Sequence, residues 1–109
     1  MRTAFADTYF YLALVSEDDA GHKKATQFSA TWKGHTITTA WVLTEVADAL
    51  ADPSQRPVFA KLLLSLQKDS HLTIVPPTQE LFERGIDLFN GRPDKAWSLT
   101  DCISFVVMQ

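Results

Sequence analysis

Three carboxylates, those of Asp7, Glu45 and Asp101, occupy positions from which an acidic metal site can be built. Several carboxylates that meet without Lys or Arg partners repel one another, unless a hard divalent cation neutralises them. Mg²⁺ and Mn²⁺ prefer such oxygen ligands and keep water molecules in their coordination shell. One of these waters can attack a phosphodiester while the metal stabilises charge on the phosphate. The three acids therefore indicate metal-dependent phosphodiester chemistry.

The position of each acid supports this interpretation to a different degree. Asp7 follows the apolar stretch 4–6 and is expected to be the last residue of a buried first strand, at the carboxyl edge where α/β sheets bind ligands. Glu45 borders the apolar face of a helix that starts near Thr39, whereas Asp48 falls on its wet face. Asp101 shares a helical stripe with the apolar positions 105 and 108 and is predicted to point inward.

Each acid also has a purely structural explanation. Asp7 can cap a helix, Glu45 can be a solvated helix charge, and Asp101 can be the acid of a capping box that opens at Ser98. The single cysteine, Cys102, is interpreted as a packed thiol. The three histidines have no metal-ligand spacing and are assigned no role.

Short strand-like runs alternate with longer helical ones, which predicts an α/β fold with a parallel sheet. The expected strands are 3–6, 35–38 and 72–75, and the expected helices cover about 8–15, 22–32, 39–51, 57–68, 78–89 and 98 onward, with a loop at 90–94.

Composition limits the classes of function. With 109 residues, of which 46% are hydrophobic, the chain forms at most one domain and buries a core without disulfides. Ten basic against thirteen acidic residues give a net charge of −3, so nucleic acid would be contacted locally or through metal ions. No apolar run approaches the ~20 residues of a membrane span, and one cysteine suits a reducing compartment. We expect a cytoplasmic protein without a membrane segment.

The last helix has a start signal and no stop signal. From Leu99 the pattern stays apolar to Gln109, without a C-cap glycine or a following strand. We therefore expect residues 1–109 to be a single domain that is incomplete at its C-terminus, lacks its last strand and continues for at least ~15 residues with a further acid. The edge of the first strand is expected to be unpaired or filled by another chain.

Three segments resemble the PIN-domain family, especially the stand-alone ribonucleases of VapC-type toxin and antitoxin pairs. They are Ala6-Asp7-Thr8, the run from Trp41 to Val46, and above all the run from Asp94 to Phe105, with sequence DKAWSLTDCISF. The resemblance implies a three-layer α/β/α sandwich with a parallel sheet. It also implies Asp7, Glu45 and Asp101 as ligands of Mg²⁺ or Mn²⁺, with Thr8 and Thr100 as accessory hydroxyls.

The first functional hypothesis is a Mg²⁺- or Mn²⁺-dependent endoribonuclease that acts as the toxin of a type II toxin-antitoxin pair. Its partners would be the RNA substrate, contacted by Arg92 and Lys95, and a cognate antitoxin protein. The apolar helices 8–15 and 57–68 are candidate surfaces for the antitoxin or for a homodimer. The alternative is a catalytically inactive PIN-fold module that binds protein. A receiver-like signalling domain is disfavoured, because the third strand ends at Val75-Pro76-Pro77 without an acceptor Asp.

Overall fold

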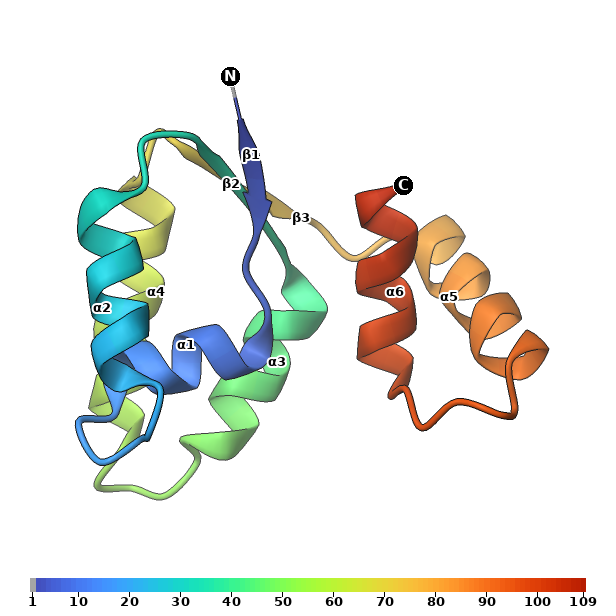
Figure 1. Ribbon diagram of the computed structural model, residues 1–109. Coiled ribbons are helices and arrows are strands. Elements are labelled where there is room, and N and C mark those ends of the chain that lie inside the picture. Colours follow the sequence, from blue (N-terminus) through green and yellow to red (C-terminus); the bar gives the residue numbers. More distant parts are fainter. Residues whose placement is uncertain (1) are drawn as a thin grey trace.

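The computed structural model describes residues 2–109, which form three strands and six helices around a parallel sheet (Figure 1). In chain order the elements are β1 (Thr3–Phe5), α1 (Thr8–Val15), α2 (His22–Thr31), β2 (His35–Thr39), α3 (Ala40–Ala49), α4 (Arg56–Lys68), β3 (Leu72–Val75), α5 (Gln79–Gly91) and α6 (Leu99–Met108). The strand order is β1-β2-β3, and both pairs are parallel. The α/β class predicted from the alternation is confirmed.

Side-chain caps start the helices that follow the strands. The Oδ1 atom of Asp7 accepts a hydrogen bond from the Phe10 amide at 2.9 Å, and Thr39 accepts one from the Val42 amide at 3.1 Å. Thr78 caps α5 in the same way. Each cap satisfies an amide that the first helical turn leaves without a partner. Since parallel strands end at one edge, α1, α3 and α5 all begin on that side of the sheet.

The core lies between the sheet and the helices α1, α3 and α4. Its most deeply buried side chains include Tyr11, Val42 and Val46, each at most 2% exposed. Figure 1 shows α2 and α4 on one side of the sheet, and α5 and α6 packed side by side on the other. Gly85 permits this close packing, because a Cβ atom there would lie 2.3 Å from Cγ1 of the buried Ile103.

Two expectations about the elements need correction. The first strand ends at Phe5 and is only partly buried, so Asp7 is the N-cap of α1 and not the last residue of a buried strand. Helix α5 continues through Gly91, where a loop was expected from Asn90. Within residues 2–109, β2 is the strand that pairs with β1, so the other edge of β1 is open.

None of the helices in the described part of the chain is long and apolar enough to cross a membrane.

Candidate functional site

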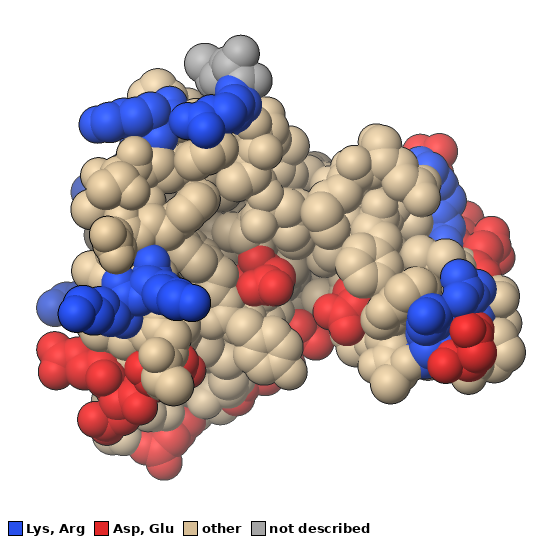
Figure 2. Space-filling view, in the orientation of Figure 1, with Lys and Arg blue, Asp and Glu red and all other residues tan. Residues whose placement is uncertain are grey.

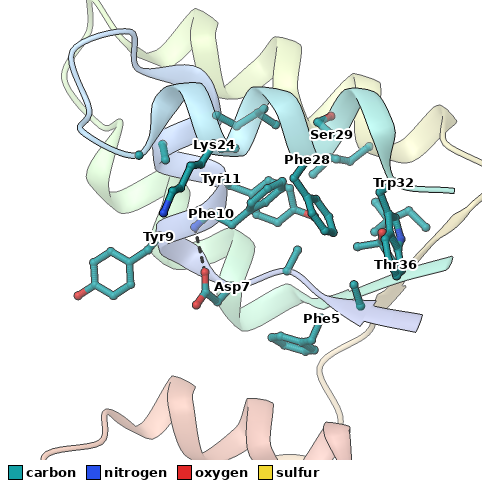
Figure 3. Close-up of a pocket in the computed structure, with 18 of the residues that line it drawn as sticks. Phe5, Asp7, Tyr9, Phe10, Tyr11, Lys24, Phe28, Ser29, Trp32 and Thr36 are labelled. Carbon is teal, nitrogen blue, oxygen red and sulfur yellow. Dashed lines mark hydrogen bonds between the residues drawn. The ribbon is translucent and has the colours of Figure 1, made fainter. Parts of the chain in front are cut away.

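Asp7 lies where the chain leaves the carboxyl end of β1 and enters α1. Its carboxylate is exposed, and Oδ1 is held by the Phe10 amide, as Figure 3 shows. Oδ2 accepts no hydrogen bond from residues 2–109. The cap therefore fixes the orientation of the carboxylate and leaves one oxygen atom for a ligand.

Glu45 reaches the same place from α3. The Thr8 hydroxyl donates a hydrogen bond of 2.6 Å to Oε1 of Glu45, and this contact is partly shielded from water. It joins the first turn of α1 to the middle of α3 and brings Glu45 beside the residue that follows Asp7. Glu45 is half-buried at the border of the core and Asp48 is exposed, as the helical period predicted.

Asp101 lies at the start of α6 and forms a capping box with Ser98. The Ser98 amide donates to Oδ2 of Asp101 at 3.0 Å, and the Asp101 amide donates to the Ser98 hydroxyl, also at 3.0 Å. The prediction that Asp101 points inward with Met108 is wrong: Asp101 is exposed and Met108 is 52% exposed. The capping box causes this, because it turns the carboxylate back toward the start of its own helix.

The buried face of α6 begins at the residue that follows Asp101. It consists of Cys102, Ile103, Ser104 and Val106. Burial raises the pKa of the Cys102 thiol, and the negative charge of Asp101 adds to the effect. Cys102 is therefore a packed, protonated thiol at neutral pH, as predicted.

The three acids are not gathered into one cluster. Among residues 2–109 no three His, Cys, Asp or Glu side chains lie close enough together to hold a metal ion, so the expected convergence is not found. The structure joins Thr8 to Glu45 near Asp7 and leaves Asp101 on α6, in the helix pair across a hollow. Figure 2 shows acidic atoms on both sides of that hollow. The oxygen donors suit Mg²⁺ or Mn²⁺ chemically, but these residues do not form a complete set of ligands.

The loop before α6 carries an ordered group of cations and an aromatic ring. Arg92 donates two hydrogen bonds of 3.0 Å to the Asp94 carboxylate, which lower the pKa of Asp94. The Arg92 guanidinium and the Lys95 ammonium each lie 5.6 Å from the centre of the Trp97 ring. Trp97 packs edge-on against Phe105, with ring centres 4.9 Å apart. The loop thus presents Arg92 and Lys95 a few residues before Asp101.

The structure contains a second feature that the sequence did not predict. An open cavity of about 1070 Å³ lies among β1, α1 and α2, with Asp7 and Tyr9 among its lining residues (Figure 3). We call it the aromatic groove, after its lining residues Phe5, Phe10, Phe28 and Trp32. The signal in the sequence was the pair Phe28 and Trp32, one helical turn apart on an otherwise polar helix.

The three-stranded parallel sheet with its six helices is a PIN-like fold. Among solved structures it is similar to the VapC20 toxin of Mycobacterium tuberculosis, which is described as cleaving the sarcin-ricin loop; the TM-score is 0.86. The two chains are 24% identical over 96% of this chain and 80% of that chain, so the likeness establishes the fold. No protein-family model and no curated protein matches the sequence. The fold that the three motifs implied is thereby confirmed.

Proposed function

We propose that this protein is an endoribonuclease of the VapC toxin type that hydrolyses RNA phosphodiester bonds with Mg²⁺ or Mn²⁺. One observation carries the proposal: in a fold shared with a toxin that cleaves RNA, Thr8 holds Glu45 beside Asp7 at the carboxyl edge of the sheet. Ligands of open α/β sheets bind at this edge.

Asp7, Glu45 and Asp101 are the proposed metal ligands. A bound divalent cation would supply an activated water and would offset charge on the phosphate. The Phe10 amide orients Asp7 and the Thr8 hydroxyl orients Glu45 at the edge of the sheet, whereas Asp101 is held in its capping box on α6. In each case one carboxylate oxygen is held, which limits the rotation of the group before a ligand arrives.

The remaining assignments belong to the same proposal. Thr100, next to Asp101, is an accessory hydroxyl, and Arg92 and Lys95 contact the RNA backbone near the cut. A cognate antitoxin and a second copy of the chain are the proposed protein partners, in the cytoplasm. Exposed apolar side chains offer surfaces for them, including Leu64 on α4 and Phe89 on α5.

A second candidate is a PIN-fold module that binds protein and does not cut RNA. The separation of Asp101 from the other two acids favours it, because an assembled site would need all three together. The two candidates differ in metal-dependent cleavage, which only the first one predicts.

The test is cleavage of a labelled RNA hairpin with the sarcin-ricin loop sequence, beside an unstructured RNA of equal length. We expect discrete products with Mn²⁺ or Mg²⁺ and none after EDTA, with cleavage restored when excess Mn²⁺ is added. Products that form equally well in EDTA, or no products from either RNA, would reject the nuclease proposal and leave the binding module.

A further inference from the structure

The aromatic groove contains a continuous series of aromatic rings. Phe10 of α1 meets Phe28 of α2 edge-on at 5.8 Å, and Phe28 stacks on Trp32 at 5.2 Å with an interplanar angle of 17°. Phe28 nevertheless remains 39% exposed, so the rings do not bury one another completely. The groove therefore has aromatic surface available to a ligand.

Tyr9 lies at the end of the groove where Asp7 is found. Its side chain is 79% exposed, far more than the other exposed large hydrophobic side chains of the described residues. Figure 3 shows the Tyr9 ring pointing outward from α1, near Asp7 and away from Phe28. Since packing within the chain does not use this ring, it is free to stack on a planar group close to the Asp7 carboxylate.

Cationic side chains lie at the two ends of the groove. Lys24 and Lys33 line it, and the ion pair found among residues 2–109 involves neither of them. Figure 3 shows Lys24 extending from α2 toward the start of α1, where Tyr9 and Asp7 lie. At the other end, the Arg2 guanidinium lies 4.9 Å from the centre of the Trp32 ring. A cationic group thus lies beside the aromatic rings at each end of the groove.

The acids in the groove other than Asp7 have local structural roles. Asp19 accepts a hydrogen bond from the Gly21 amide at 2.7 Å, and Asp69 accepts one from the His71 amide at 2.8 Å. Both carboxylates stabilise turns, and their charge is partly satisfied there. With Asp7 they outnumber the two lysines of the lining, so the groove is not basic overall, and a backbone phosphate would be contacted locally by Lys24.

We propose that the aromatic groove binds single-stranded RNA next to the bond that is cut, with Tyr9 stacking on a base beside Asp7 and Lys24 contacting the backbone. The inference rests on the proposed function, because Asp7 marks the place of cleavage. Aromatic rings combined with cations along a groove are the features by which proteins bind single strands without reading their sequence. An apolar protein segment would use the rings but would gain nothing from Lys24 and Lys33.

The test measures RNA binding separately from cleavage. A short single-stranded RNA containing 2-aminopurine is titrated with the full chain in EDTA, and both affinity and fluorescence quenching by stacking are recorded. We expect Tyr9→Phe to behave like the parent, and Tyr9→Leu to bind about 10-fold more weakly and to lose quenching. Lys24→Gln should weaken binding at low salt and reduce its salt dependence. Phe82→Leu, which removes a 40% exposed aromatic ring from α5 outside the groove, is the matched control and should match the parent.

Two results would overturn the groove proposal. One is parent-like affinity and quenching in Tyr9→Leu, even if the parent cleaves RNA, in which case the nuclease proposal stands alone. The other is a parent dimer, detected by sedimentation, that Tyr9→Leu disrupts while RNA binding stays unchanged; the groove would then hold a second copy. Binding that depends on Tyr9 in a protein that never cleaves RNA would support the groove and reject the nuclease.

Discussion

At the scale of single residues, several polar side chains hold structure and candidate site together. Thr8 donates to Glu45, and Thr38, fully buried, donates to the Ala6 carbonyl at 2.9 Å. Thr38 thereby ties β2 to the segment that carries Asp7. A buried hydroxyl group that makes a hydrogen bond lowers the stability of the fold little, whereas a buried hydroxyl group without one lowers it by about 1–3 kcal/mol. These contacts make the position of Asp7 a consequence of the core.

Tyr11 gives the fold a stability that depends on pH. It is 2% exposed, and burial raises its pKa to about 12 from the ordinary 10.0, against a smaller lowering by the hydrogen bond with Thr38. A raised pKa in the folded state gives stability that is complete below the unfolded pKa and is lost as pH rises through the folded one. We expect about 2 kcal/mol to disappear between pH 10 and pH 12.

Urea unfolding of the parent and of Tyr11→Phe from pH 8 to pH 12 measures this loss. The difference in unfolding free energy between the two proteins should be constant up to about pH 10 and should then shift in favour of Tyr11→Phe. Parallel curves up to pH 12 would show that Tyr11 is not responsible.

At the scale of elements, the contact between α5 and α6 depends on a glycine. A Cβ at Gly85 would lie 2.3 Å from Cγ1 of Ile103, whereas a Cβ at Gly91 meets nothing within 4 Å. Overpacking lowers the free energy of unfolding by about 1–3 kcal/mol, whereas replacing a glycine within a helix by alanine raises it by up to about 1 kcal/mol. We therefore expect Gly85→Ala to lower the free energy of unfolding by about 1–2 kcal/mol, as measured in urea.

Gly91→Ala is the matched control for this effect. It has the same change of side chain in the same helix without the clash, and it should be neutral or slightly stabilising. If Gly85→Ala were as stable as Gly91→Ala, the close packing of α5 on α6 would not hold in solution.

Much of this element structure was predictable, because it depends on local signals. Thr39, Thr78 and Ser98 each cap a helix that the sequence predicted to start at or near them. The orientation of the Asp101 carboxylate was not predictable. Helical periodicity predicts the face of the helix from which a side chain leaves the backbone, whereas the capping box determines the direction in which the carboxylate points. The aromatic groove lies between helices that are separated by a turn, so no single periodic segment revealed it.

At the scale of the whole molecule, the acids belong to two packed groups of elements. Asp7 and Glu45 are carried by α1 and α3 around the sheet, and Asp101 is carried by the α5 and α6 pair, with a hollow between them (Figure 2). Helices α1 and α3 begin directly after β1 and β2, at the carboxyl edge of the sheet. The proposed function makes RNA cleavage the first activity to measure.

The most direct measurement compares the Mn²⁺-dependent RNA cleavage rates of the parent, Asp7→Asn and Asp48→Asn under single-turnover conditions. Asparagine can still cap α1, so the fold should persist, which circular dichroism checks. Because several kcal/mol of charge stabilisation depend on the metal, we predict a loss of about 100-fold or more in Asp7→Asn. Asp48→Asn, on the exposed face of α3, should cut like the parent. Equal rates for the parent and a folded Asp7→Asn would contradict the metal-dependent nuclease.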